Sequence, residues 1–465
     1  MMARGKKKES ALTPEEKLAQ ALVSVEEQPY PVPENWCWAR GVSIFKAMET
    51  RKPEGEYFDY IDIDAIDNAL QVVTEPKHTA VKDAPSRASR AVHYGDTIFS
   101  LVRPYLRNIA FIDEPLKDCI ASTGFYVCSP TAIVIPRYLY LLMTSSYVVD
   151  GLNKYMKGDN SPSIRKDDIE LFAYPIPPVE EQKRIVDRIE YLFAKLDEAK
   201  EKARSVLDSF ETRKAAILHK AFTGELTAKW RKTNIFSVNN QFNNTSEYPY
   251  SLPSEWSAVI LGELVQIRRG ASPRPIKAFI TDTIDGINWI KIGDADGSKY
   301  ITSIKEKVTP AGAKKSVYVE KGTLLLSNSM SFGHPYILEV DGCIHDGWLA
   351  ILPSVYFDKE FLYYALLFSS WYFEQVAVGT AVRNLNSERV AGTPLPICSI
   401  EEQKEIVRIL DSLFAKEQQA KEAAEAVLEK IDLLKKSILA RAFRGELGTN
   451  DPTEESALEP LKTIL

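Results

Sequence analysis

A 47-residue segment occurs twice in this chain, and its hydrophobic spacing restricts the possible folds more than any other feature. Residues 180–226 align with residues 401–447 without a gap, at an offset of 221, with 24 identities over the 47 positions. The first copy opens "EEQKRIVDRIEYLFAK" and the second opens "EEQKEIVRILDSLFAK". An unbroken match of this length indicates an internal duplication, so we expect the two halves of the chain to share an architecture.

Apolar residues in both copies recur with the a and d spacing of a heptad, which predicts two long amphipathic helices. The first copy has the series Ile185, Leu192, Ala199, Val206 and the series Ile189, Leu196, Ala203, Phe210, Ile217. The second copy has Ile406, Leu413, Ala420, Val427, Leu434 and the series Leu410, Ala424, Ile431, Ile438, with Glu417 as the interruption. A helix of about 43 residues would be roughly 64 Å long. We expect the two stripes to pack on each other as an intramolecular coiled coil; packing on separate domains and homodimerisation are the alternatives.

Both copies carry signals for the ends of a helix. Ser399 stands three residues before Glu402, as in a capping box, and Gly224 and Gly445 suit the left-handed position after a helix. The tripeptide "EQK" in each copy also has the Glu-x-Lys spacing of many nuclease sites. Because glutamates at a helix start are stabilised by the helix dipole, we interpret them as capping residues.

The composition is that of a globular protein without metal sites or membrane segments. The chain has 465 residues, 45% of them hydrophobic, and a net charge of −6. Its five cysteines form no CxxC pair and its five histidines have no ligand spacing, so we expect a reduced, metal-free, cytoplasmic protein. The basic start "MMARGKKKES" has no apolar core after it, and the run "FLYYALLF" is too short to cross a bilayer.

The regions before the two helices also resemble each other. "PYPVPENW" from Pro29 matches "PYSLPSEW" from Pro249, at an offset of 220. Both regions are rich in proline, glycine, aromatics and short alternating runs, which predicts short strands with a few helices. The stretch "KTNIFSVNNQFNNTSEYPY" from Lys232 has the composition of a linker. Each half is therefore expected to be a mixed globular region followed by a long helix.

This order of parts resembles the specificity subunit of a type I restriction-modification enzyme. The residues that carry the resemblance are "EEQ" and "FxGEL" in each helix and the proline-rich junctions "YPIPPVEEQ" and "TPLPICSIEEQ". The fold implied is α+β: two mixed α/β target recognition domains separated by two long helices in an intramolecular antiparallel coiled coil, with a pseudo-twofold internal repeat. The expected regions are an N-terminal helical arm (1–28), a first recognition domain (29–174), a central helix (175–232), a linker (233–247), a second recognition domain (248–393) and a C-terminal helix with tail (394–465).

The resemblance also implies a function. Subunits of this family bind double-stranded DNA, read a bipartite target with one domain for each half-site, and use the helices as a spacer and as the docking surface for methyltransferase subunits. S-adenosylmethionine, ATP and magnesium are expected on the methyltransferase and restriction/translocase subunits, and no cofactor is expected on this chain. The helices are nearly neutral, with ten acidic and ten basic residues in the first copy and ten and nine in the second, which favours protein partners over DNA for that surface.

Motifs for catalysis are missing from the sequence. There is no GxxxxGK[ST] phosphate loop, no GxGxxG fingerprint and no NPPY-like tetrapeptide of amino-methyltransferases. We therefore predict a non-catalytic subunit. A coiled-coil structural adaptor that does not bind DNA, and a remnant of a fused restriction-modification enzyme, are the alternatives.

Candidate DNA-binding residues are basic or amide side chains in polar segments. In the second domain they lie in "IRRGASPRPIK", interpreted as a loop, and in "GTAVRNLN": Arg268, Arg269, Arg274, Lys277, Arg383, Asn384 and Asn386. In the first domain they lie in "KHTAVKDAPSRASR", also interpreted as a loop, in "HYGDTIFSLVRPYLRN" and in "GDNSPSIRKDD": Lys77, Arg87, Arg90, Arg103, Arg107, Ser163, Arg165 and Lys166. For "GTAVRNLN" a glycine turn that caps the following helix is the alternative, and for any single arginine a solvated surface role is.

The chain ends suggest one further contact. "TPEEKLAQAL" from Thr13 is expected to form a short capped helix, and the tail "DPTEESALEPLKTIL" from Asp451 turns from acidic to apolar. We expect the two to pack together near the end of the second long helix.

Overall fold

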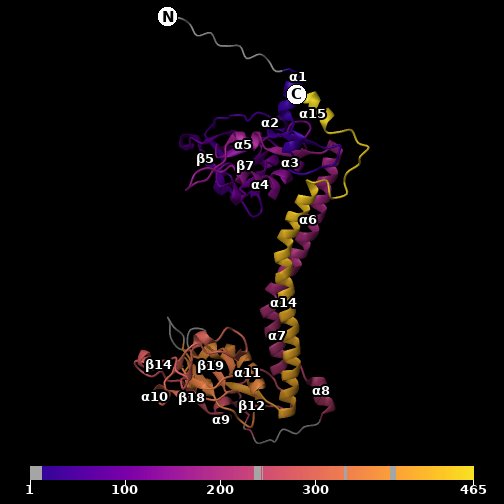
Figure 1. Ribbon diagram of the computed structural model, residues 1–465. Helices are drawn as coiled ribbons and strands as arrows, with labels where there is room; N and C mark the ends of the chain where they lie inside the picture. Colours follow the sequence, from indigo (N-terminus) through magenta and orange to yellow (C-terminus); the bar gives the residue numbers. More distant parts are fainter. Residues whose placement is uncertain (1–12, 235–241, 243, 329–331, 378–383) are drawn as a thin grey trace. The chain divides into compact units, whose positions relative to one another are not determined.

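The computed structural model of the chain describes residues 13–234, 242, 244–328, 332–377 and 384–465. The chain divides into two compact units: unit 1 comprises residues 1–204 and 426–465, and unit 2 comprises residues 205–425 (Figure 1). Each unit contains a mixed α/β domain and a segment of both long helices. The first twelve residues and most of the expected linker lie outside the described residues.

The domain of unit 1 is built from short strands with helices at their ends. Its helices are α1 (Pro14–Ala21), α2 (Gly41–Ile44), α3 (Pro136–Met143), α4 (Ser146–Asn153), α5 (Lys166–Glu170) and α15 (Leu458–Ile464). Its strands are β1 (Cys37–Arg40), β2 (Tyr57–Ile61), β3 (Ile66–Asp67), β4 (Val72–Val73), β5 (Lys77–Ala80), β6 (Ala88–Ala91), β7 (Thr97–Ser100), β8 (Ile109–Phe111), β9 (Ile120–Ser122), β10 (Phe125–Cys128) and β11 (Ala173–Ile176). They form sheets in the orders β10-β7-β8 and β5-β2-β9-β6 and the pairs β1-β11 and β3-β4.

Unit 2 repeats this plan with larger sheets. Its shorter helices are α8 (Ala228–Thr233), α9 (Leu261–Leu264), α10 (Pro310–Ala313), α11 (Lys359–Phe368), α12 (Ser370–Val376) and α13 (Ser387–Ala391). Its strands are β12 (Ser257–Ile260), β13 (Ile267–Arg269), β14 (Ile280–Thr281), β15 (Ile287–Ile290), β16 (Tyr300–Ile301), β17 (Lys307–Val308), β18 (Val317–Val319), β19 (Leu324–Ser327), β20 (Pro335–Leu338), β21 (Gly342–Ile344), β22 (Trp348–Ile351) and β23 (Pro394–Ile397). The sheet orders are β13-β22-β19-β20-β16 and β14-β17-β15-β21-β18, and β12 pairs with β23.

The long helices pack antiparallel on each other within each unit. They are α6 (Val179–Asp208), α7 (Phe210–Phe222) and α14 (Ile400–Ala442). In unit 1, α6 lies beside the end of α14, and Lys435 Nζ is 2.6 Å from Asp197 Oδ1 (Figure 1). In unit 2, α7 lies beside the first half of α14, and Arg213 Nε donates to Glu417 Oε2 at 2.8 Å. The predicted intramolecular coiled coil and the α+β class are confirmed.

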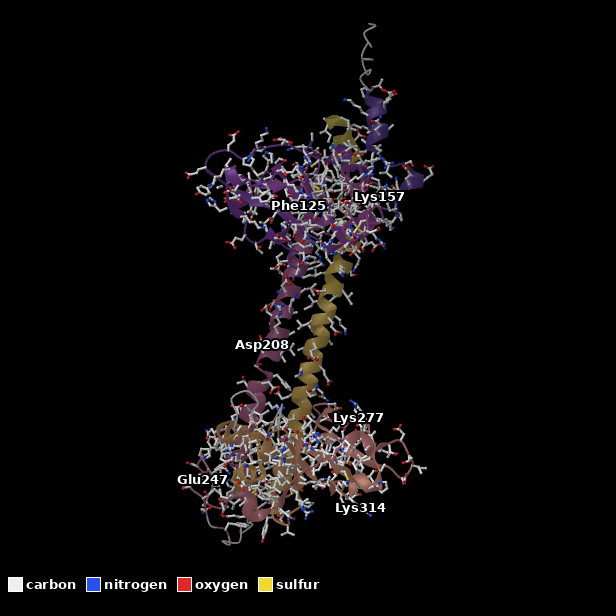
Figure 2. All side chains as sticks on the ribbon, turned by 90° about the vertical axis from the view of Figure 1, so that its left-hand side faces the viewer. Phe125, Lys157, Asp208, Glu247, Lys277 and Lys314 are labelled. Carbon is white, nitrogen blue, oxygen red and sulfur yellow. The ribbon has the colours of Figure 1, made fainter. Side chains whose placement is uncertain are left out.

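The prediction of one unbroken helix in each copy is correct for the second copy and wrong for the first. Helix α14 has 43 residues, whereas the first copy is divided into α6, with 30 residues, and α7, with 13. Ser209 lies between them, and Asp208 just before it is labelled in Figure 2. Ser209 Oγ donates to the carbonyl of Ser205 at 2.6 Å, a contact that bends helices. The second copy has lysine at the corresponding position, which cannot make this contact.

One of the two predicted apolar series is wrong in the second half of α14, whereas Ala424 and Ile431 of the other series are buried as predicted. Ala420 is exposed, and the side chains of Val427 and Leu434 are 39% and 47% exposed. The neighbouring Leu428 and Lys435 are turned inward instead. The cause is Glu417, which pairs with Arg213 inside the seam. Along α14, the inward-facing residues before and after Glu417 are each four positions away from it. Two four-residue steps in succession rotate the buried face around the helix.

In each copy of the repeat, the end of the helix is followed by a glycine that packs on a proline of the adjoining domain. Gly224 and Gly445 have φ of +78° and +74°, which confirms their predicted left-handed conformation. A Cβ on Gly445 would lie 2.5 Å from Pro33 Cγ, and one on Gly224 would lie 2.4 Å from Pro253 Cγ. Glycine is therefore needed at both positions for two reasons: its backbone is left-handed, and a side chain would collide with the proline.

A pair of alanine substitutions separates these two requirements. Gly448 is also left-handed, with φ of +71°, but nothing lies within 4 Å of the position of its Cβ. Gly448→Ala is expected to cost about 1 kcal/mol, the conformational penalty alone. Gly445→Ala is expected to cost about 3 kcal/mol because Pro33 must also move. Equal losses in chemical unfolding would show that the proline contact contributes nothing.

The expected contact between the chain ends is confirmed within unit 1. Helix α1 has the predicted capping box, in which Thr13 and Glu16 bond reciprocally. Lys17 Nζ lies 2.6 Å from the carbonyl oxygen of Leu465, and Leu461 of α15 is completely buried. None of the helices in the described part of the chain combines the length and apolar composition that a bilayer crossing requires.

Candidate nucleic-acid interface

A tryptophan–glutamate contact attaches each domain to its long helix. In unit 1, Trp36 Nε1 donates to Glu181 Oε2 at 2.7 Å, and in unit 2, Trp256 Nε1 donates to Glu402 Oε2 at 3.0 Å. Both carboxylates are buried, at 0% and 4% exposure. The second pair also includes Arg231, whose Nη2 lies 2.7 Å from Glu402 Oε1. The glutamates do begin their helices, and Ser399 Oγ accepts from the N–H of Glu402 at 3.2 Å, as predicted. The carboxylate of Glu402 bonds to the domain instead of back to Ser399, so the reciprocal half of the capping box is wrong.

The glutamine of each "EEQ" motif makes a second attachment. Gln182 accepts from the backbone N–H of Ile135, at the start of α3, and donates to two carbonyls. Gln403 does the same with the N–H of Asp358, at the start of α11, and two carbonyls. Both amides are completely buried. The repeated motif is therefore the frame that holds each domain, and among the described residues no cluster of three metal-ligating side chains occurs.

In unit 1 this frame carries an edge made of three polar segments. The turn between β9 and β10 bonds to two of them: Thr123 N–H donates to the carbonyl of Arg87 at 2.8 Å, and Leu101 N–H donates to the carbonyl of Gly124 at 2.8 Å. Arg103 N–H donates to Pro162, beside Ser163, at 2.8 Å. Three segments with separate predictions of DNA binding therefore meet around the turn between β9 and β10.

Unit 2 has an edge of the same construction. Asn328 N–H donates to the carbonyl of Gly347 at 2.9 Å, as Leu101 does to Gly124 in unit 1. Leu385 N–H donates to the carbonyl of Asn328 at 2.9 Å, as Ile164 does to Leu101. The turn before β22, the segment after β19 and the segment before α13 thus form the second edge, with β13 beside them.

Some predicted residues of unit 1 are engaged by the protein itself. Lys77 lies on β5 and Arg90 on β6, so the interpretation of that segment as a single loop is wrong; β-strand pairing with β2 and β9 orders it. Lys77 Nζ bonds to Asp62, which raises the pKa of the lysine. Arg107 donates to the carbonyl of Thr144 and to Ser146 Oγ, at 2.8 and 3.1 Å.

The remaining predicted residues of unit 1 lie at or near the edge. Arg87 is exposed, and Arg103 donates from Nη2 to the carbonyl of Asn160 at 2.9 Å. Ser163 forms bridges with Val102 and Lys157, and Lys157 is labelled in Figure 2. Arg165 is exposed before α5, and Lys166 is paired with Glu170 at 3.2 Å.

In unit 2 the basic segment begins as a strand. Arg268 and Arg269 end β13, paired with β22, so the interpretation of these two residues as part of a loop is wrong. Both are exposed, and so are Arg274 and Lys277, of which Lys277 is labelled in Figure 2. Asn384 is exposed as well. These cations and the amide are therefore accessible to solvent.

The other two predicted residues of unit 2 have different outcomes. Asn386 Oδ1 accepts from the N–H of Arg389 at 2.9 Å and caps α13, as in the alternative interpretation of this segment. Arg383 lies outside the described residues.

Sequence reasoning missed the turn at the centre of each edge. In unit 2 it contains His345 and Asp346, and Ser272 Oγ donates to Asp346 Oδ1 at 2.7 Å. In unit 1 the corresponding residues are Ser122 and Thr123. One signal in the sequence could have found these turns. The dipeptide Cys-Ile precedes both of them, and its two copies are separated by nearly the same offset as the two long helices.

Comparisons with known proteins agree with this architecture. The model of the type I restriction modification DNA specificity domain matches residues 39–206 and 253–430. The EcoDI specificity subunit of Escherichia coli is 28% identical over 337 residues, which cover 69% of this chain and 72% of that protein. The HindI specificity subunit of Haemophilus influenzae is 25% identical over 422 residues, covering 79% and 90%. The crystal structure of the HsdS subunit from Thermoanaerobacter tengcongensis superposes with a TM-score of 0.71 at 26% identity, covering 91% of this chain and 100% of that one. The chain belongs to the type I restriction-modification specificity subunits and carries their DNA specificity domain twice.

Proposed function

We propose that this chain reads a bipartite double-stranded DNA target, with one half-site for each domain, and delivers methyltransferase subunits to it. The observation that carries the proposal is the edge built twice on the same frame: the backbone contacts of the two edges correspond, while their side chains differ. A reader of two different half-sites needs such a pair, because base edges are distinguished by side chains and the backbone contacts only set position.

The two edges supply both kinds of group that DNA recognition needs. Arg268, Arg269, Arg274 and Lys277 are exposed cations suited to phosphates or to guanine. Further side chains that could contact phosphates or bases are Asn384 in unit 2 and Arg87, Arg103 and Arg165 in unit 1. The weaker candidates of the predicted set are those whose polar atoms are already engaged: Arg107, Lys77, Lys166 and Asn386.

The long helices are the proposed docking surface for the methyltransferase subunits. Their near neutrality, with ten acidic and nine basic residues in the second copy, suits a protein partner better than a polyanion. At 43 residues, α14 is about 64 Å long, and we propose that this fixed length sets the number of base pairs between the half-sites.

The chemistry is assigned to other subunits of the complex. We propose that the chain is non-catalytic, that S-adenosylmethionine binds the methyltransferase subunits, and that ATP and magnesium bind a restriction/translocase subunit. The complex is proposed to act in the cytoplasm.

Methylome sequencing tests the proposal directly. Cells that express this chain with its partner methyltransferase are compared with cells that express the methyltransferase alone. We expect a split methylated motif that disappears when this chain is omitted. If the methyltransferase is active and no motif depends on this chain, the recognition role is refuted and the structural adaptor becomes the better description.

The salt dependence of DNA binding gives a second expected result. Lys277→Ala is expected to reduce the slope of log affinity against log salt concentration by about 1, because a phosphate without its lysine keeps its condensed counterion when the complex forms. Lys314→Ala removes the same charge from another exposed site of unit 2 and is expected to leave the slope unchanged (Figure 2). Fluorescence anisotropy at several salt concentrations measures both slopes. Identical slopes for the two variants would remove Lys277 from the interface.

A further inference from the structure

The carboxylate of Asp346 has a fixed orientation at the centre of the edge of unit 2. One oxygen, Oδ1, accepts from Ser272 Oγ at 2.7 Å and lies 2.8 Å from His345 Nε2. Among the described residues no other residue donates a hydrogen bond to the second oxygen, Oδ2. The side chain is 36% exposed, so water or a ligand can reach it. Asp346 therefore presents one oriented acceptor, held by its neighbours before any ligand binds.

The turn is tied to the basic segment on one side and to the segment after β19 on the other. Arg269 Nε approaches the backbone carbonyl of Asp346 at 3.4 Å, and Asn328 Nδ2 donates to the same carbonyl at 2.8 Å. Leu385 N–H in turn donates to the carbonyl of Asn328. Asp346 consequently lies among the residues that the proposed function assigns to DNA.

The carboxylate is ionised at neutral pH. Partial burial opposes ionisation, but the hydrogen bond from Ser272 and the attraction of His345 outweigh it and hold the pKa of Asp346 below its ordinary value. A fixed negative charge repels phosphate, so its use at a DNA-binding edge must be contact with a hydrogen-bond donor. In the major groove the exocyclic amino groups of cytosine and adenine are the donors, and a lone carboxylate acceptor is the usual partner of cytosine N4, whereas adenine is matched by a bidentate amide.

We propose that Asp346 determines specificity in the second domain by accepting a hydrogen bond at Oδ2 from the amino group of a cytosine in its half-site. This inference rests on the proposed function and adds to it one residue and one base. His345 and Ser272 are positioning residues, which hold Oδ1 and leave Oδ2 to the base. In unit 1 the corresponding residue is Thr123, which carries no charge, so the first domain is expected to lack this cytosine contact.

The test compares Asp346→Asn with the native chain in the complex with its methyltransferase. The probes are two duplexes that carry the motif found by methylome sequencing and differ only at one cytosine of the second half-site. The native complex is expected to prefer the cytosine duplex, and Asp346→Asn is expected to reduce that preference about tenfold, the size of one base contact. The first half-site and the spacing between half-sites should not change. Asp285→Asn removes an equal, exposed charge from unit 2 and should keep the native preference.

Each alternative role of Asp346 gives a different result. If Asp346→Asn binds every duplex more tightly, the carboxylate only repels phosphate. If the variant binds every duplex more weakly and melts at a lower temperature, the role of Asp346 is purely structural. Either result overturns the proposal. His345→Ala keeps the carboxylate and its hydrogen bond from Ser272 but removes one of the two groups that hold Oδ1. It is expected to relax the same base position by a smaller factor even if Asp346→Asn folds poorly. A native complex without any sequence preference would refute the proposed function itself, which separates that failure from this one.

Discussion

Replacing Glu402 by glutamine is expected to lower the stability of unit 2 by about 3 kcal/mol, within the range for breaking a buried ion pair. The carboxylate accepts from Thr227, Arg231 and Trp256 at distances of 2.7 to 3.0 Å, and its side chain is 5% exposed. A glutamine has the same shape, but its amide N–H₂ would replace an acceptor and would meet one of these donors. The side chain of Arg231, 13% exposed, would also lose its counter-charge.

Hydrogen exchange of α8 and of the first turns of α14 measures this effect locally. Glu401→Gln is the matched control, because Glu401 is exposed and its loss should change protection by less than about 0.5 kcal/mol. Glu181→Gln tests the repeat: its direct partners Trp36, Thr449 and Asn450 are neutral, so a smaller loss of about 1–2 kcal/mol is expected. Protection of α8 that is the same in Glu402→Gln and Glu401→Gln would refute the structural importance of the buried pair.

Deleting residues 450–465 is expected to cost unit 1 about 4 kcal/mol. The deletion removes Glu454, whose two oxygens accept from Arg184 at 2.7 and 2.8 Å, and Asn450, which donates to the buried Glu181 at 2.8 Å. It also removes Leu461, which is completely buried in the hydrophobic core of unit 1 and by itself accounts for about 2–3 kcal/mol. Loss of the partner of a buried carboxylate accounts for the rest.

Thermal unfolding of the deleted chain measures the total, and Lys462→Ala provides the control. Lys462 belongs to the deleted segment, but its Nζ only pairs with Glu459 at the surface, so the substitution should be nearly neutral. A deleted chain that melts at the native temperature, and still binds its methyltransferase, would show that the tail has no structural role.

The helices were predictable from the sequence because their periodicity is a local property. The repeat, the left-handed glycines and the antiparallel pairing all follow from spacing and from the need of each stripe for a partner. The two errors come from contacts of single side chains. Ser209 bonds to its own helix, and Glu417 finds Arg213 only once the register is set. Neither contact has a signature in the spacing of apolar residues.

The strands around the basic residues were harder to predict. The segments around four of the basic residues are rich in polar residues, glycine or proline, a composition that favours loops. These residues are Lys77, Arg90, Arg268 and Arg269. They are ordered by pairing with strands distant in sequence, as in β13 with β22, about 80 residues apart. Strand propensity depends on such neighbours more than helix propensity does, so a local pattern does not reveal it.

The candidate interface was predicted in part. Three of the segments named from the sequence meet at the edge of unit 1, and their binding of DNA stays a prediction. The engagement of Arg107 by Thr144 and Ser146 could not be foreseen from a positive charge. Asp346 was missed for the opposite reason: a search for basic groups passes over a carboxylate, whose use becomes visible only when Ser272 and His345 are seen to hold it.

The repeated frame has a consequence for how such chains diverge. Trp36, Trp256, Glu181 and Glu402 are buried and bonded to one another in each half, so nearly every substitution there is penalised by misfolding. The turn residues His345 and Asp346 are partly exposed and belong to no hydrophobic core among the described residues. Substitutions accepted over generations should therefore accumulate at the turn while the frame stays constant. A lineage could in this way acquire a new target by point mutation in one half, without a compensating change in the other.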